Sequence, residues 1–388
     1  MSRTVDVPPK EMNHHVATIT EEALTALRAK IGTTRLSREE PTLEEATKDA
    51  IRHWARAIGD RDPRWTDEDY ARSTPAGGIV APPSMIYGFS LQAIGDRSGL
   101  PGVHSFFGGA EHEWYLPIRR NDRIDVSVRL VDVAIRHGEF AGRSVKQTSE
   151  VLFTNQDGAV VARTLPWGIR TERGAGSKGS KHEDLSPAAY TDDDIERIAA
   201  LYAAEPSKIR GVIPRYWDDV TAGDSLGELV RGPWTATNSV CFMRVYGGQF
   251  LKTHSYWYDY LAKHPKAGRP NHQGIPEGPS RGHWDNEYAR SVGVPAAYDY
   301  GPERIAWLCS LATYWAGDHG TLRKLRVTLR RFNLQGDLTT LTGRVTEKVE
   351  VDGRAIVRCD VSATDQRGIT TAAGEVEIEL PRKTPSPN

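Results

Sequence analysis

The chain has 388 residues, and its 50 Lys and Arg against 51 Asp and Glu leave a formal net charge of −1. Proteins that bind nucleic acids or anionic membranes usually carry a basic excess or a basic stripe, so we expect neither kind of partner. Apolar residues make up only 38% of the chain, which also contains 36 Gly and 23 Pro. This composition favours many turns and irregular connections over a helical bundle.

The sequence shows no sign of export or membrane insertion. Its N-terminal segment lacks the apolar stretch of a signal peptide, and no run of about 18 apolar residues occurs. The three cysteines, Cys241, Cys309 and Cys359, are far apart and odd in number, which suits reduced thiols better than a disulfide framework. We therefore expect a soluble, cytoplasmic protein.

The first half of the chain predicts one helix and then a run of long strands. A Gly/Pro-rich stretch leads into a helix predicted over residues 84–96. The turn at Asp157-Gly158 is typical of a hairpin between two strands. The strands that we predict cover residues 123–136, 142–154 and 159–171.

The second half repeats this order after a polar segment, residues 173–187, which is rich in Gly, Ser and Lys and reads as a linker. A helix is predicted over residues 302–316, because Ile305, Leu308 and Trp315 recur at helical spacing. Four strands are then predicted, over residues 322–334, 339–351, 355–364 and 369–380.

Short strings also repeat between the two halves. The seven residues that begin at Asp67 match those that begin at Asp285, with five identities at an offset of 218 residues. The pair Asn121-Asp122 corresponds to Gly336-Asp337 at an offset of 215, and residues 154–158 correspond to 364–368 at an offset of 210. The offsets shrink in one direction, as small loop deletions would produce. We infer two diverged copies of one domain.

Each copy therefore combines one apolar helix with long antiparallel strands, which predicts an α+β fold in which a sheet wraps a central helix. Two such sheets can pair edge to edge, and the chain would then be a covalent pseudo-dimer without exposed edges at the junction. We predict an N-terminal domain over residues 1–172, a linker over 173–187 and a C-terminal domain over 188–388.

The repeated strings carry a resemblance to a known family. The residues from Gly59 to Ala71 resemble the (R)-specific enoyl-CoA hydratase motif of MaoC-like hot-dog proteins, roughly G-D-x-N-P-x-H-x-D-x-x-Y-A. Residues 78–83 look like the helix lead-in of the N-terminal dehydratase domain of tandem MaoC-like proteins. In the second copy, residues 283–289 are similar to H-x-D-x-x-Y-A, and residues 293–301 occupy the place of the family's P-I-A-H-G segment. The resemblance implies a double hot-dog fold.

The resemblance also implies a catalytic Asp and His five residues apart, which orient one water, and a backbone N–H that polarises the thioester carbonyl. Neither copy holds the complete pair. The first copy has Asp60 but has Trp65 at the His position, and the second has His283 but has Gly278 at the Asp position. We expect the first copy to be non-catalytic, with Trp65 filling the vacated site.

We expect His283 to act as the catalytic acid and base, and Gly301 to supply the N–H for the thioester oxygen. Three carboxylates could replace the missing Asp. Asp299 is the first choice, because family geometry puts its segment beside the histidine, and Glu277 is the second. The third is Asp60, if the pseudo-dimer brings it near.

Two further features concern the substrate. The strand residues Arg326, Arg330 and Arg331 could contact the phosphates of coenzyme A, because a guanidinium matches phosphate with a bidentate fork. The second copy also carries a long aromatic insertion over residues 247–281, which we interpret as a cover over the acyl tunnel.

Two functions remain open. The first is the reversible hydration of an enoyl-CoA, or dehydration of the 3-hydroxyacyl-CoA, with a bulky, branched or cyclic acyl group. The alternative is a non-catalytic protein that binds acyl-CoA or an acyl carrier, with degenerate sites. We expect no metal, because the histidine spacings match no zinc signature, and no cofactor besides the coenzyme A of the substrate. We also expect a homodimer of the pseudo-dimeric chain.

Overall fold

The structure, a computed structural model, describes residues 18–36, 41–96, 98–100, 103–138, 142–172, 188–248 and 250–383. The predicted linker over residues 173–187 lies outside the described residues. The domain boundaries that we derived from the sequence therefore stay a prediction.

The first half contains strands β1 (Thr34–Leu36), β2 (His104–Trp114), β3 (Ile124–Gly138), β4 (Gly142–Asn155) and β5 (Val160–Thr171). Its helices are α1 (Glu21–Arg28), α2 (Lys48–Ala57), α3 (Glu68–Ser73) and α4 (Ile86–Phe89), with the 3₁₀ turns η1 (Pro63–Trp65), η2 (Pro83–Met85) and η3 (Leu91–Ile94).

The second half contains strands β6 (Ser225–Arg231), β9 (Thr321–Leu329), β10 (Thr339–Val351), β11 (Arg354–Asp365) and β12 (Thr370–Glu379), with a small hairpin of β7 (Arg269–Pro270) and β8 (Pro276–Glu277). Its helices are α5 (Asp192–Ala204), α6 (Ala236–Tyr246), α7 (His254–Lys263), α8 (Asn286–Ser291) and α9 (Gly301–Ala316), with the turns η4 (Glu205–Lys208), η5 (Trp217–Asp219) and η6 (Pro279–His283).

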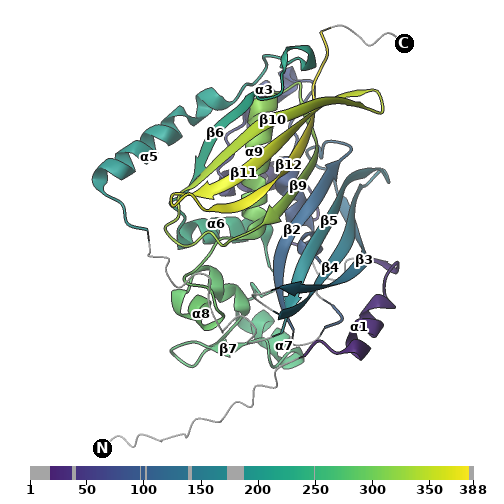
Figure 1. The fold of residues 1–388 in the computed structure, drawn as a ribbon, viewed down its shortest axis with the longest axis vertical. Helices are drawn as coiled ribbons and strands as arrows, with labels where there is room; N and C mark the ends of the chain where they lie inside the picture. The colour runs from purple at the N-terminus through teal and green to yellow at the C-terminus, as the bar shows by residue number, and fades with distance from the viewer. Residues whose placement is uncertain are drawn as a thin grey trace, which may run out of the picture.

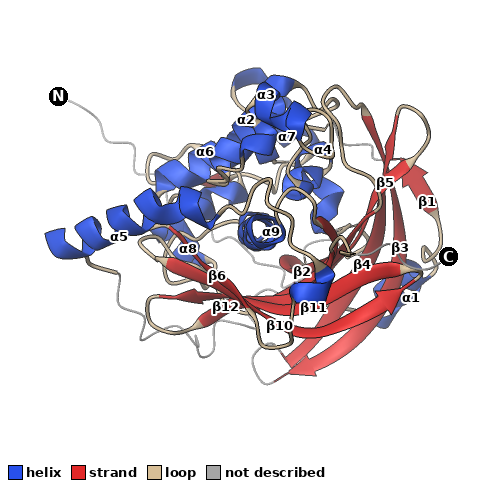
Figure 2. Ribbon diagram, turned by 90° about the horizontal axis from the view of Figure 1, so that it is seen from above, coloured by secondary structure: helices blue, strands red, loops and turns tan. Residues whose placement is uncertain are grey.

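Ten of these strands form one sheet in the order β1-β3-β4-β5-β2-β9-β12-β11-β10-β6. The first five come from the first half and the last five from the second, and β2 pairs antiparallel with β9 where the halves meet (Figure 1). The helices gather on the inner side of the curved sheet, where α9 is seen end on in Figure 2. The predicted α+β class and the double hot-dog architecture are confirmed.

Helix α9 is the centre of the core. Every residue from Pro302 to Ala316 is buried, because the sheet and the helices around α9 leave no solvent-facing stripe on it. Pro302 is favoured near the helix start, and Gly317 ends the helix at a φ of 72°. The core cluster includes Leu325 and Val327 of β9, so these side chains face α9.

The hydrogen bonds of the two halves confirm the repeat. Bonds in the first half recur in the second between residues related by the offsets of 218, 215 and 210 found in the sequence. By the offset of 218, Trp65 corresponds to His283 and Pro83 corresponds to Gly301. The bond from Ala81 N to Ile118 O in the first half matches the bond from Asp299 N to Asn333 O in the second. The bond from Gln156 Nε2 to Asp122 Oδ1 likewise matches the bond from Gln366 Nε2 to Asp337 Oδ1.

Three expectations about secondary structure need correction. The helix predicted over residues 84–96 is broken into η2, α4 and η3, because Ser90 is extended and its hydroxyl caps Gln92 N instead of continuing the helix. The strand predicted over residues 322–334 ends at Leu329. The strands β1, β2 and β6 were not predicted. Within the described residues, no helix has the length and apolar character needed to cross a membrane.

Candidate functional site

His283 lies beside the N-terminal end of α9. The turn η6 ends at His283, and Asp285 then caps α8 by accepting a hydrogen bond from Tyr288 N. The Nδ1 atom of His283 is 2.7 Å from the carbonyl oxygen of Tyr298. Because a carbonyl only accepts, Nδ1 carries a proton, so Nε2 is the nitrogen that can act as the base when the ring is neutral.

Aromatic rings surround this imidazole. The ring of Tyr300 stacks on His283 with centroids 3.6 Å apart, and the ring of Tyr298 meets it edge-on at 4.5 Å. Tyr298 also contacts Phe332 at 4.8 Å, and Phe332 contacts Phe106 of β2 at 6.1 Å. The surroundings of His283 are thus largely apolar and include a residue of the first half.

Gly301 begins α9 and immediately follows Tyr300. A Cβ atom built at this position would lie 2.4 Å from Leu329 Cδ1 and 2.8 Å from Phe107 Cδ1, so a larger residue would require these side chains to move. The first N–H groups of a helix have no acceptor within the helix, and they carry the positive end of its dipole. The backbone at Gly301 can therefore donate to a carbonyl oxygen close to His283.

Asp299 lies two residues before Gly301 in the chain, but its carboxylate forms an ion pair with Arg304. Its Oδ2 atom is 2.8 Å from Arg304 Nε, and its side chain is fully buried. Burial raises the pKa of Asp299 to about 7, which the Arg304 charge opposes. Asp299 and His283 are thus linked through the backbone of Tyr298, the residue before Asp299, whose carbonyl oxygen lies 2.7 Å from His283 Nδ1. The role of Asp299 as the acid partner stays a prediction.

Glu277 lies at the end of β8 and forms an ion pair with Arg281, at 3.2 Å between Oε2 and Nη1. Arg281 is buried and also pairs with Asp285 at 2.9 Å. This arginine holds the loop before His283 to the cap of α8. The carboxylate of Glu277 is 39% exposed, and its place in catalysis also stays a prediction.

The remaining predicted residues, Asp60 and Trp65, lie at another part of α9. Asp60 Oδ2 accepts a hydrogen bond from Ser310 Oγ at 2.8 Å, and Ser310 is about 13 Å along the helix from Gly301. Burial raises the pKa of Asp60. Trp65 is 3% exposed, with the Arg64 guanidinium 4.7 Å above its ring. The structure therefore does not bring Asp60 to His283.

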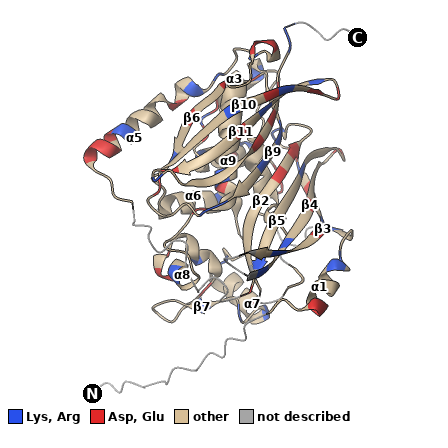
Figure 3. Ribbon diagram, viewed as in Figure 1, with Lys and Arg blue, Asp and Glu red and all other residues tan. Residues whose placement is uncertain are grey.

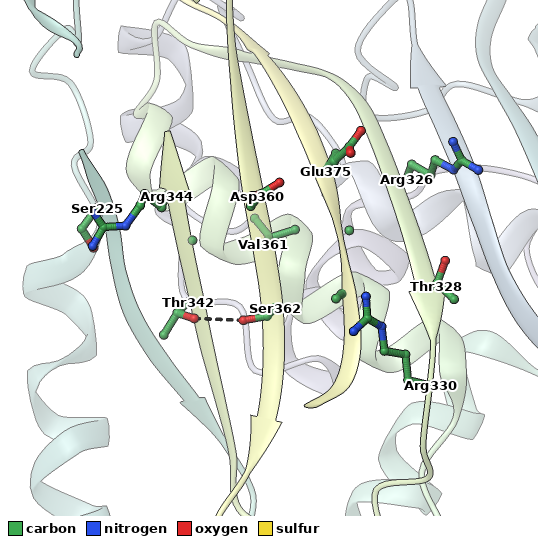
Figure 4. Close-up of a pocket in the computed structure, with 13 residues that line it drawn as sticks. Ser225, Arg326, Thr328, Arg330, Thr342, Arg344, Asp360, Val361, Ser362 and Glu375 are labelled. Carbon is green, nitrogen blue, oxygen red and sulfur yellow. Dashed lines mark hydrogen bonds between the residues drawn. The ribbon is translucent and has the colours of Figure 1, made fainter. Parts of the chain in front are cut away.

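The predicted arginines lie on the outer face of the sheet. Arg326 and Arg330 are exposed and alternate with Leu325 and Val327, which face α9. Both arginines line a groove of about 740 Å³ across β9, β12, β11 and β10, which is drawn in Figure 4. Arg331 is exposed just beyond the end of β9. Lys and Arg are interspersed with Asp and Glu over the face shown in Figure 3.

The predicted insertion over residues 247–281 contains α7 and the β7–β8 hairpin, and it leads directly into η6 (Figure 1). Trp257 stacks on Tyr260 with centroids 5.8 Å apart and donates a hydrogen bond to the Pro276 carbonyl. Phe250 and Trp257 also close on Gly278, where a Cβ atom would lie 2.8 Å from Phe250 Cβ. The insertion is thus packed by its own aromatic side chains.

Sequence reasoning missed several residues of this site, namely Tyr300, Tyr298, Phe107 and Leu329. Tyr298 and Tyr300 lie in the segment that we matched to P-I-A-H-G, so their position was available. Their rings gave no catalytic signal, because aromatic residues before a buried helix usually pack in the core.

Residues 33–164 match a family model described as the FAS1-like dehydratase domain region. The 3-oxo-4,17-pregnadiene-20-carboxyl-CoA hydratase alpha subunit of Mycobacterium tuberculosis is 28% identical over 175 residues, which cover 39% of this chain and 53% of that protein. A UPF0336 protein of Streptomyces coelicolor is 27% identical over 88 residues, which cover 21% of this chain and 59% of that protein. The chain spans about half the length of these curated relatives.

Solved structures resemble the chain over most of its length. A MaoC-like dehydratase has a TM-score of 0.64 at 19% identity and covers 92% of this chain and 100% of its own. A conserved hypothetical protein of Mycobacterium tuberculosis with a double hotdog fold has a TM-score of 0.53 at 10% identity, with coverages of 90% and 96%. At these low sequence identities, the similarity shows a shared fold and no more. Together with the family model, they confirm the predicted resemblance to MaoC-like double hot-dog proteins.

Proposed function

We propose that this chain, which has the double hot-dog fold of the MaoC-like dehydratases, hydrates an enoyl-CoA thioester reversibly. One observation carries the proposal. The imidazole of His283 stacks on Tyr300, the residue before Gly301, so a possible base lies next to the start of α9, where the backbone N–H groups could serve as the oxyanion donor. The named hydratase among its relatives supports the same reaction class.

In this reaction, His283 Nε2 accepts a proton from water while the water oxygen bonds to C3 of the enoyl group. The electron pair of the double bond moves toward the thioester, and the N–H at Gly301 stabilises the enolate oxygen. The imidazolium then returns its proton to C2, so the product is the 3-hydroxyacyl thioester. The reverse steps dehydrate that product. The reaction needs no cofactor beyond the coenzyme A that the substrate carries.

The scheme leaves the position of the dyad carboxylate to be filled, because Gly278 stands there in the second half. Asp299 and Glu277 remain the predicted partners, but each is engaged by an arginine, Arg304 or Arg281. Because both carboxylates are held in ion pairs, this observation favours the alternative function, in which the site binds an acyl-CoA or an acyl carrier without turning it over. Both functions use the same site, so activity separates them.

The acyl group that we propose is bulky, branched or cyclic. The first half has only the four-residue α4 where the second half has the 16-residue α9, so less helix fills its sheet. The relative named for a pregnadiene carboxyl-CoA supports a polycyclic substrate.

We propose that Arg330 and Arg331, at the end of β9 beside the Leu329–Gly301 contact, meet the coenzyme A phosphates. We also keep the homodimer as a proposal, which the mass in solution tests.

The experiment follows the absorbance of the enoyl thioester over a panel of short, branched, aromatic and polycyclic trans-2-enoyl-CoA esters. We expect His283→Ala to lower kcat/KM for the best ester by about 10²–10⁴-fold, because the base and proton donor are lost. Binding of the ester should change little. His319→Ala is the matched control, since His319 is exposed beyond the other end of α9. Turnover in His283→Ala equal to wild type would exclude the mechanism, and tight binding without turnover by wild type would favour the binding function.

A further inference from the structure

Tyr300 lies at the start of α9, and the family motif gives this residue no role. It is the residue before Gly301 and caps α9 with extended backbone, at a φ of −86° and a ψ of 132°. Its ring lies flat against His283, with an interplanar angle of 23°. The phenol, the imidazole and the first N–H of the helix therefore converge on one small region.

The hydroxyl of Tyr300 is buried without a hydrogen-bond partner of normal geometry among the described residues. The whole residue is only 8% exposed. Leaving such a group unpaired costs about 1–3 kcal/mol, so a buried phenol of this kind usually marks a place where water or a ligand binds. Burial raises the pKa of Tyr300 well above its usual value, and a hydrogen bond with the Ser280 side chain opposes this rise. The phenol thus stays protonated and can donate.

The two candidate carboxylates are already engaged in ion pairs. Asp299 is 2.8 Å from Arg304, and Glu277 is 3.2 Å from Arg281. The ring of Tyr246 is 5.6 Å from that of Tyr300. The ring of Tyr300 thus contacts the imidazole, and its hydroxyl has no hydrogen bond of normal geometry within the described residues.

We propose that Tyr300 is a further catalytic residue, whose hydroxyl hydrogen-bonds the water that His283 deprotonates and takes over the water-orienting task of the missing dyad carboxylate. This inference rests on the proposed hydratase function. The phenol keeps its proton throughout. His283 receives the proton of the water and returns it to C2, so the atoms balance without a second base.

The test compares Tyr300→Phe with Tyr115→Phe, which removes the hydroxyl of an exposed tyrosine of the first half, on the best enoyl-CoA ester of the panel. The phenylalanine at position 300 keeps the stacking on His283 and removes only the hydroxyl. We expect kcat to fall about 10–100-fold with KM within about twofold, because a positioned hydrogen-bond donor is lost. Tyr115→Phe should stay within about twofold of wild type.

A purely structural role would instead lower the thermal midpoint or raise KM while kcat stays constant, and that result would overturn the assignment. If Tyr300→Phe does not fold, 3-fluorotyrosine at position 300 replaces it. This residue keeps the hydroxyl and the stacking, so kcat should shift with the acidity of the phenol and the fold should not change. Wild type without turnover on every ester overturns the proposed function itself, whereas active wild type with equally active Tyr300→Phe overturns only this inference.

Discussion

The two halves share one repeat, yet they treat the start of their central helix in opposite ways. In the second half, Gly301 opens α9 with a free N–H under Leu329. The first half has Pro83 at the corresponding position, and proline has no backbone N–H to give. There Trp114 donates its indole N–H to the Pro83 carbonyl at 3.0 Å.

The same contrast appears at the motif. Where the second half has the half-buried His283, the first half has Trp65, which is 3% exposed. The first-half motif is instead tied to the far part of α9 through Asp60 and Ser310 and through Arg61 N and the Tyr314 hydroxyl. The first half thus lacks both the donor and the base that we propose for the second, and its motif instead contacts the far part of α9.

The largest expected effect comes from filling the space at Gly301. Gly301→Ala places a methyl group against Leu329 and Phe107, which moves the N–H, and we expect kcat to fall about 100-fold or more. Pro83→Ala restores an N–H in the first half and should leave kcat unchanged. Steady-state kinetics on the best enoyl-CoA ester checks both. Equal kcat values for the two variants would contradict the assignment of the donor to the second half.

A smaller effect is expected when the histidine is given back to the first half. Trp65→His shrinks a buried side chain, so we expect a loss of about 2–4 kcal/mol in the free energy of unfolding, measured with urea. It should not restore turnover in the His283→Ala background, because Pro83 still lacks the N–H. A gain of more than about tenfold in that double variant would show that the first half retains a usable site.

The fold was readable because its signals are local and periodic. The α9 helix and most strands end within two residues of their predicted limits, whereas Ser90 broke the first-half helix through a cap that periodicity does not reveal. Of the site, His283 and Gly301 follow from the motif. The pairing of Asp299 with Arg304 could not be predicted, since it depends on how α9 turns the Arg304 side chain toward the preceding loop. Tyr300 could not be predicted, because the role that we propose for it depends on the burial of its hydroxyl, which the sequence does not show.

The smallest effect concerns a polar group that the first half alone keeps in its core. His112 is fully buried between the hydroxyls of Tyr87 and Thr164, and Val327 stands at the matching position of the second half by the offset of 215. Burial lowers the pKa of His112 to about 3, below the value of roughly 6.5 in an unfolded chain. The stability that this neutral imidazole permits is therefore complete above pH 6.5 and is lost as the pH falls toward 3.

This loss amounts to about 1.4 kcal/mol per pH unit at its steepest, because only the unfolded chain binds the proton. His112→Val should remove that slope from urea unfolding curves between pH 6 and pH 4, at a uniform cost of about 1–3 kcal/mol for the two hydroxyls left without a partner. His137→Gln, which changes an exposed histidine of β3, should keep the wild-type slope. An unchanged slope in His112→Val would mean that the acid sensitivity arises outside this buried group, and the core of the first half would then be no more pH-dependent than that of the second.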